Sequence, residues 1–339
     1  MKKIVILGAG SWATGLARIL TDNEHCVTLW GRNRQQIEHF KATNCNIAFM
    51  PEQKLVGDVH YTTDLNEALK TADFVVNAVP TQHVREVLSK KPPIPEAAVI
   101  VNAAKGLEVG SNLRISEIVK EYYPNHSYAV LSGPSHAEEV VKRMPTTLVA
   151  ASYQKSVALA VQALFMCSYA RIYAHADVKG VELCGALKNV IAISAGICDG
   201  LGFGDNTLAA LMTRGIVEMK RLGQAMGAQV HTFDGLAGIG DLIVTCMSNH
   251  SRNRRCGQLI GRGYNLEAAV AEIGAAVEGV WTIKAAEFLR KAHQVEMPIV
   301  EQLYKVLYQS AAPQDAVKLL MDRESKVESE FQPETDVWQ

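Results

Sequence analysis

The sequence predicts two successive domains, a doubly wound α/β sheet followed by an all-helical domain. Up to about residue 175, short β-branched runs alternate with helical patterns, which is the rhythm of a parallel sheet covered by helices. From Asp177 onward, long segments rich in Ala, Leu, Met and Ile with helical spacing replace the strands. The length of 339 residues also favours two domains over one. We therefore expect domains at residues 1–176 and 177–324, with a polar tail at 325–339.

Six segments of the first domain predict strands, at residues 3–7, 26–30, 73–79, 97–103, 128–133 and 146–151. Helical patterns follow after Ser11, Asn33, Asp64, Thr81, Ser135 and Gln154. The charged tail carries Pro333, which predicts a frayed or disordered end beyond about Glu324.

The overall charge and the cysteines limit the classes of function. A net charge of −1 argues against a general nucleic-acid or membrane-surface binder, so the expected partners are small molecules. Seven cysteines without a C-x-x-C pair indicate reduced thiols in a cytoplasm. The N-terminus lacks the pattern of a signal peptide, and no apolar run approaches ~18 residues, which predicts no membrane span. A homodimer is expected because it is the commonest assembly.

A glycine fingerprint directly follows the first strand and opens a helix. Gly8, Gly10 and Ala13 form G-x-G-x-x-A, which predicts a Rossmann-type dinucleotide site in preference to a plain glycine turn. The amides of Ser11 and Trp12 are expected to face the diphosphate, where a helix N-terminus favours negative charge.

The end of the second strand bears on the choice of coenzyme. An NAD-selective site usually carries Asp or Glu there, ~20 residues beyond the glycines. Trp30 and Gly31 occupy that place and Arg32 follows. We expect NADP(H) to bind well, with NAD(H) as the other possible coenzyme; the alternative for Arg32 is a solvated surface side chain.

Several polar residues fall where ligands of such sheets bind, beyond the carboxyl ends of strands. Lys105 follows the fourth predicted strand, and the turn "SGPSHAEE" follows the fifth. Gly133 frees backbone amides to meet a ligand, while Ser135 and Glu138 fit a capping box, so Ser135 has both a structural and a functional reading.

The helical half carries a phosphate-binding pattern. A glycine turn precedes Asp241 and Thr245, and the cluster "SRNRR" begins at Ser251. Ser251, Arg252 and Asn253 at a helix start suit a phosphate, whereas a local nucleic-acid patch would need interleaved aromatic residues. None of the ten histidines has a metal-ligand spacing, so no catalytic metal is expected.

The stretch "VELCGALKNVIAISAG" places two charges, Glu182 and Lys188, in an apolar helix. Lys188 shares its face with Val181, Cys184, Gly185, Ile191, Ala192 and Ala195. Burial there would lower the pKa of the ammonium toward working pH, which suits proton transfer, and Asp241 would oppose that shift if it faced Lys188. The alternative is a lysine that extends to the domain edge with its stem buried.

These motifs together resemble the bacterial NAD(P)-dependent glycerol-3-phosphate dehydrogenases. The segments "GAGSWATGLA", "AKGLE", "SGPSHAEEV", "VELCGALKNVIAISAGICDGLGFGDN", "TRGIVEM", "GLAGIGDLIVTC", "HSRNRRCG" and "EGVWT" follow in order from Ile4 to about Leu320. The resemblance implies an enzyme that interconverts dihydroxyacetone phosphate and sn-glycerol 3-phosphate for glycerophospholipid synthesis. It also implies a second domain like the C-terminal domain of 6-phosphogluconate dehydrogenase.

The resemblance assigns roles to residues of this chain. Lys188 is implied as the proton-transfer residue, with Lys105 and Asp241 beside it. The implied substrate contacts are Lys105, Gly133, Ser135, Asp241, Ser251, Arg252 and Asn253. Besides the glycine fingerprint, the implied cofactor contacts are Ser11, Trp12, Arg32, Lys105, Ala137, Arg252, Ala276 and Glu278.

The chain departs from the family pattern at two places. Ala13 and Gly15 look exchanged, which predicts retained pyrophosphate binding with looser helix packing. Ala276 and Trp281 replace the usual Val and Arg, which leaves the nicotinamide-side contacts open. A sister dehydrogenase acting on a 3-hydroxy acid or sugar carboxylate and a non-enzymatic NADP(H) sensor are the alternatives; the phosphate cluster and the two lysines with Asp241 argue against them.

Overall fold

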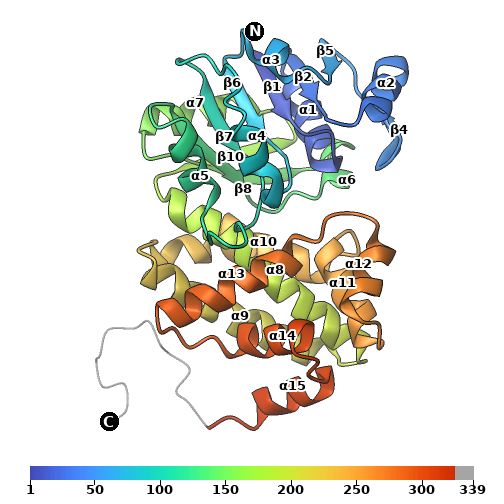
Figure 1. Cartoon of the computed structure of the whole chain (residues 1–339), viewed down its shortest axis with the longest axis vertical. Helices are drawn as coiled ribbons and strands as arrows, with labels where there is room; N and C mark the ends of the chain where they lie inside the picture. The colour runs from blue at the N-terminus through green and yellow to red at the C-terminus, as the bar shows by residue number, and fades with distance from the viewer. Residues whose placement is uncertain (325–339) are drawn as a thin grey trace.

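The computed structural model describes residues 1–324 and stacks an α/β half on a helical half (Figure 1). The predicted disorder of the tail lies outside the described residues. An eight-stranded sheet forms the centre of the first half, in the order β10-β9-β8-β7-β6-β1-β2-β5. Its strands are β1 (Lys3–Leu7), β2 (Cys26–Trp30), β5 (Val59–Thr62), β6 (Phe74–Asn77), β7 (Val99–Asn102), β8 (Tyr128–Ser132), β9 (Thr146–Ala151) and β10 (Ala170–His175).

The sheet confirms the six predicted strands and corrects two expectations. The sequence analysis missed the edge strands β5 and β10 and a separate hairpin of β3 (Cys45–Asn46) and β4 (Met50–Lys54). Half-exposed edge strands such as β10 carry polar residues at alternate positions, so their apolar signal is weak. The sheet is also not wholly parallel, because β9 pairs antiparallel with β8 while β10 runs parallel to β9.

The helices of this half mostly begin where the sequence predicts. They are α1 (Ser11–Asp22), α2 (Arg34–Thr43), α3 (Leu65–Leu69), a 3₁₀ turn (Thr81–His83) leading into α4 (Val84–Leu88), α5 (Ile115–Tyr122), α6 (Ala137–Val140) and α7 (Lys155–Phe165). The sequence analysis missed α5. The capping box was wrong: His136 caps α6, and the Ser135 hydroxyl donates instead to the Gly133 carbonyl.

The second half is helical throughout its described part, as expected. It contains α8 (Val178–Gly200), α9 (Asp205–Ala225), a 3₁₀ turn (Val230–Asp234), a π-helical turn (Leu236–Gly240), α10 (Asp241–Met247), α11 (Arg252–Gly261), α12 (Leu266–Ile273), α13 (Glu278–Ala292), α14 (Pro298–Tyr308) and α15 (Pro313–Met321). The side chain of Asp177 caps α8 by accepting from the amide of Gly180.

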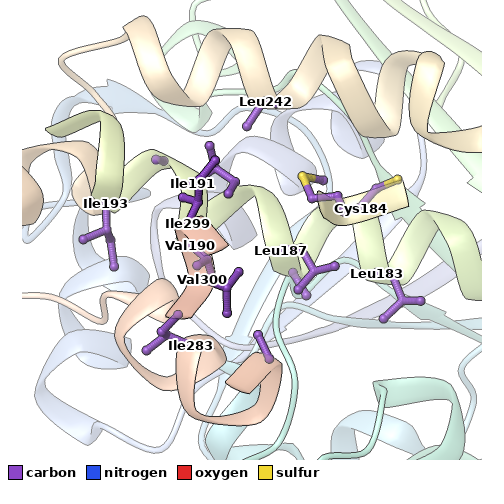
Figure 2. Close-up of a cluster of buried hydrophobic side chains, with 14 of the residues drawn as sticks. Leu183, Cys184, Leu187, Val190, Ile191, Ile193, Leu242, Ile283, Ile299 and Val300 are labelled. Atoms are coloured by element: carbon purple, nitrogen blue, oxygen red, sulfur yellow. The ribbon is translucent and has the colours of Figure 1, made fainter. Parts of the chain in front are cut away.

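Helix α8 is the centre of the helical half, and the other helices pack around it. The hydrophobic cluster of Figure 2 sets Leu187, Val190 and Ile191 of α8 among side chains of α10, α13 and α14. The sequence predicted one apolar face of α8, around Lys188. The structure buries the helix on all sides, because every residue from 180 to 198 is buried. Among the described residues, α8 alone is long and apolar enough to cross a membrane, and 94% of its most apolar window lies buried in the protein.

Helices α8 and α11 cross at a contact of four glycines. A Cβ on Gly196 or Gly200 would lie 2.0 or 2.4 Å from carbonyl oxygens of α11, and one on Gly257 or Gly261 would lie 2.1 or 2.5 Å from carbonyl oxygens of α8. No side chain fits at these distances, so backbone packs directly on backbone. The contact fixes Lys188 on α8 relative to the start of α11.

Candidate active site

A cavity of about 200 Å³ lies where the carboxyl ends of the strands face the helical half. Its walls come from the segments after β1, β6, β7 and β8 and from α8, α10, α11 and the start of α13. The cavity brings together these predicted site residues: Ser11, Trp12, Lys105, Ser135, Ala137, Lys188, Ser251, Arg252, Asn253, Ala276 and Glu278. Other predicted residues do not line it: Gly8, Gly10, Ala13, Arg32, Gly133 and Asp241.

One carboxylate joins two lysines at the base of the cavity. The Lys188 ammonium donates to Asp241 Oδ1 at 2.5 Å and to the Thr245 hydroxyl at 2.7 Å. The Lys105 ammonium donates to Asp241 Oδ2 at 2.7 Å and to the Gly133 carbonyl at 2.8 Å. An ammonium group has three N–H donors, so each lysine keeps one for a ligand in the cavity.

Burial and charge set the protonation states of this group. Burial is the largest influence on the pKa of Lys188 and lowers it, Asp241 opposes that shift, and nearby Lys105 adds to it, so that the pKa falls from 10.5 to about 8. Burial alone would raise the pKa of Asp241, but Lys105 and Lys188 outweigh it and keep that pKa below its ordinary value. The result is an ionised carboxylate beside a lysine that can gain and lose a proton near neutral pH.

Gly133 requires glycine for two reasons. Its φ of +133° lies in a region that side chains disfavour, and a Cβ would come within 3.1 Å of Leu148 Cα and the Thr147 carbonyl. The Gly133 carbonyl accepts hydrogen bonds from the Lys105 ammonium and from the Ser135 hydroxyl. Gly133 therefore orients its neighbours through its carbonyl rather than lining the cavity through its amide.

A chain of side-chain amides crosses the floor of the cavity. Asn189 donates to the Lys105 carbonyl at 3.1 Å and accepts from Asn253 at 2.9 Å. Asn253 in turn accepts from the amide of Gly279 at 2.9 Å. The chain ties α8, α11 and α13 to the segment that carries Lys105, so both asparagines have a structural task beside any contact with a ligand.

The start of α11 presents only part of the predicted phosphate cluster. Ser251 caps the helix by accepting from the amide of Arg254, and exposed Arg252 lines the cavity. Arg254 turns away, donating to Asp199 and Asn249, and Arg255 lies outside the cavity. Arg252 is therefore the arginine of this cluster that is available to a ligand.

The glycine turn after β1 fits a dinucleotide. Gly8 has φ +117°, and a Cβ there would lie 2.9 Å from the Ala78 carbonyl oxygen. At Gly10 a Cβ would meet nothing within 4 Å, so the backbone is open to an approaching diphosphate. Gly10 caps α1 without a side-chain hydrogen bond, which leaves the first helical amides available to an anion.

Ala13 and Gly15 stand as if exchanged, and the looser helix packing expected from that exchange stays a prediction. Ala13 is completely buried, and a Cβ on Gly15 would lie 3.4 to 3.5 Å from Trp12 and Val140, at ordinary contact distance. Trp12 is held by a hydrogen bond from its indole N–H to the Ala103 carbonyl.

Glu278 forms part of the cavity wall beside Thr81, and its Oε1 accepts from the amide of Thr81 at 2.9 Å. Burial raises the pKa of this carboxyl. Ala276 and Ala137 complete this wall, whereas Trp281 lies outside the cavity and stacks against Lys284.

Arg32 lies outside the cavity on the surface beyond β2. Its side chain is 66% exposed and its Nη1 lies 3.6 Å from Glu86 Oε2. The Trp30 indole donates to the Thr63 carbonyl. Strand β2 ends at Trp30 and Gly31 follows, and neither residue carries a carboxylate.

Two histidines at the cavity were missed by the sequence analysis. His136 and His250 both line it, with ring centroids 5.8 Å apart. Both adjoin predicted site residues in the motifs "PSHA" and "NHSR", and this adjacency is the signal in the sequence that points to them.

One group among the described residues brings metal-ligand atoms together away from this cavity. Atoms of Cys26, Asp58 and His60 lie within 4.8 Å of one another. The group sits at the amino ends of β2 and β5, opposite the edge that carries the cavity. Sequence spacing does not reveal it, because the sheet register pairs residues more than thirty positions apart.

Comparisons with known proteins match both halves of the chain. The family model for the N-terminus of NAD-dependent glycerol-3-phosphate dehydrogenase matches residues 3–158 of this chain. The family model for the C-terminus of the same enzyme matches residues 177–318. Glycerol-3-phosphate dehydrogenase (NAD(P)+) of Bacillus velezensis is 50% identical over 327 residues, 95% of each chain. That of Syntrophomonas wolfei is 48% identical over 334 residues, 97% of each. The crystal structure of glycerol-3-phosphate dehydrogenase from Coxiella burnetii has a TM-score of 0.92 at 37% identity, covering 95% of this chain and 99% of that one.

Proposed function

The chain belongs to the NAD(P)-dependent glycerol-3-phosphate dehydrogenase family and is an NAD(P)-using oxidoreductase, and on that premise we propose that Lys188 transfers the proton. The proposed reaction interconverts dihydroxyacetone phosphate and sn-glycerol 3-phosphate. The observation that carries the proposal is the buried Lys188–Asp241 pair in a cavity shared with the glycine turn and Arg252.

A bound NAD(P)H supplies the hydride. As the carbonyl carbon accepts it, negative charge gathers on the carbonyl oxygen. The remaining N–H of Lys188 can stabilise and then protonate that oxygen. In the opposite direction, neutral Lys188 removes the proton from the hydroxyl. Asp241 holds the Lys188 side chain in place in both directions and remains ionised.

The phosphate is assigned to the start of α11. Arg252 offers a planar pair of donors, and the N-terminus of this ten-residue helix favours an anion. Lys105 also lines the cavity, and one of its N–H groups is left over after its hydrogen bonds to the Gly133 carbonyl and Asp241. Substrate would thus span the cavity between a phosphate end at Arg252 and a reacting end at Lys188.

Arg32 is assigned to the 2′-phosphate of NADPH. The absence of a carboxylate at the end of β2, the exposure of Arg32 and the N-terminus of α2 at Arg34 all favour a negative group there. The remaining cofactor contacts are assigned to Ser11, Trp12, Ala137 and Glu278 around the cavity.

Compartment, assembly and pathway complete the proposal. Seven free cysteines, four of them buried, support a reducing cytoplasm. The homodimer stays a prediction from the frequency of that assembly. The product sn-glycerol 3-phosphate is proposed to serve glycerophospholipid synthesis.

The proposal is tested by following NADPH oxidation on addition of dihydroxyacetone phosphate, with unphosphorylated dihydroxyacetone as the control. We expect oxidation with the phosphorylated ketone and a far lower rate with the control, because the latter lacks the group assigned to Arg252. Equal rates with both ketones would contradict the phosphate site, and no oxidation with either would contradict the activity.

A further inference from the structure

Glu86 faces Arg32 across the surface where the adenosine ribose of a dinucleotide is expected. Arg32 follows β2 and Glu86 lies on α4, which follows β6. These two strands flank β1, whose following turn carries the glycine fingerprint. The ribose binds beyond the carboxyl ends of such strands.

The Glu86 carboxylate lies among several nitrogen-bearing side chains of this surface. Its Oε2 lies 3.6 Å from Arg32 Nη1 and 3.4 Å from His83 Nδ1, and its Oε1 lies 3.7 Å from Lys90 Nζ. Arg32 is thus already paired with a carboxylate when no phosphate is bound.

A 2′-phosphate would have to share Arg32 with this carboxylate. The phosphate carries a charge of about −1.5 to −2 at neutral pH, so Glu86 repels it. The 2′-hydroxyl of NADH is neutral and meets no such repulsion. A carboxylate is also the usual partner of that hydroxyl, and the end of β2 offers none.

We propose that Glu86 is a coenzyme-selecting residue that restrains the preference for NADPH which Arg32 creates. The inference rests on the proposed assignment of Arg32 to the 2′-phosphate. Arg32 and Glu86 act in opposite directions, and the balance between them keeps both coenzymes usable.

The test measures kcat/KM for NADPH and for NADH at saturating dihydroxyacetone phosphate. Glu86→Gln should raise the NADPH/NADH ratio about two- to fivefold, the range that exposed charge pairs provide. Glu86→Lys should raise it further, because it adds a cation. Both effects should shrink as salt is raised, since these side chains are exposed. Glu301→Gln on α14 makes the same change in net charge far from the ribose surface and should leave the ratio unchanged.

Arg32→Ala separates failure of this inference from failure of the Arg32 assignment. We expect Arg32→Ala to lower kcat/KM for NADPH about tenfold or more and for NADH little. If Arg32→Ala behaves so but Glu86→Gln leaves the ratio unchanged or lowers it, Glu86 merely supports Arg32 and the inference is overturned. If Arg32→Ala weakens both coenzymes equally, the assignment of Arg32 itself is overturned.

Discussion

Lys188 Nζ lies 2.5 Å from Asp241 Oδ1, and both side chains are almost completely buried. The residues are 53 positions apart and come from different helices, α8 and α10. The second oxygen of Asp241 binds Lys105. A single carboxylate therefore holds both lysine side chains, and its removal should act on both.

Lys188→Met should give a folded protein that binds NADPH but is nearly inactive. Methionine keeps an unbranched stem, and Asp241 keeps Lys105 as its partner. Loss of general acid–base catalysis should lower kcat about 10²- to 10⁴-fold. Thermal unfolding and NADPH titration check the fold, and Lys179→Met on the same helix is the control. Retention of a tenth of wild-type kcat with an unchanged pH profile would assign the proton to Lys105 or water.

The two reaction directions should respond oppositely to pH. The pKa of Lys188 is lowered to about 8, so the ammonium is lost as pH rises through about 8. Ketone reduction requires the ammonium, and its kcat/KM should fall across that range. Alcohol oxidation requires the neutral amine and should rise there. Parallel pH profiles in both directions would argue against Lys188 as the titrating group.

Asp241→Asn should shift the same titration to lower pH. The carboxylate raises the pKa of Lys188, so its loss leaves burial and Lys105 unopposed. Loss of the carboxylate that buried Lys188 and partly buried Lys105 share should also cost about 3–5 kcal/mol of folding free energy. Denaturant unfolding measures the stability and the kcat/KM profile measures the shift. A profile that does not move would show that Asp241 does not tune Lys188.

Arg252→Lys should damage substrate use although it keeps the charge. A lysine cannot reproduce the planar two-point contact of a guanidinium with phosphate. We expect kcat/KM for dihydroxyacetone phosphate to fall by the equivalent of about 1–3 kcal/mol. Arg255→Lys, three positions further along α11 and outside the cavity, is the matched control. If both variants match the wild type, Arg252 does not bind the phosphate.

Glu218 should make stability depend on pH away from the cavity. It accepts from the amides of Ile299 and Val300 at the start of α14, yet burial raises its pKa to about 8. The folded chain then holds a proton that the unfolded chain loses near pH ~4.3, so this contribution to stability falls as pH rises from about 4 to 8. Glu218→Gln should flatten that slope, at the cost of about 1 kcal/mol for one lost hydrogen bond. Urea unfolding across this pH range measures both, and an unchanged slope would exclude Glu218.

The sequence predicted the parts of the fold that repeat a local pattern. The glycine turn after β1 and the helix starts after Asn33 and Asp64 depend on adjacent residues, and they stand where predicted. Strand β10 and the antiparallel pairing of β8 with β9 depend on neighbours in the sheet, so local patterns did not reveal them. The domain limits at 176 and 324 stay predictions.

The site followed the same division. Lys188 and Arg252 can be recognised as candidates from the sequence. Lys188 is a charge in an apolar helix, and Arg252 belongs to a basic cluster at a helix start. The sequence does not reveal which residues each of them contacts in the fold. Ser135 was expected to cap a helix and instead binds the Gly133 carbonyl, and Arg254 leaves the phosphate cluster to pair with Asp199. Such contacts depend on the tertiary packing.

The four-glycine contact between α8 and α11 bears on the length of substrate that fits the cavity. Carbonyl oxygens of one helix lie against the glycines of the other, so the helices cannot slide or separate without losing that contact. Lys188, assigned to the reacting end of the substrate, lies on α8. Arg252, assigned to the phosphate end, lies on α11. The contact therefore sets the spacing of their backbone positions. We expect a phosphorylated ketone one carbon longer or shorter than dihydroxyacetone phosphate to fit this spacing less well and to be a poorer substrate.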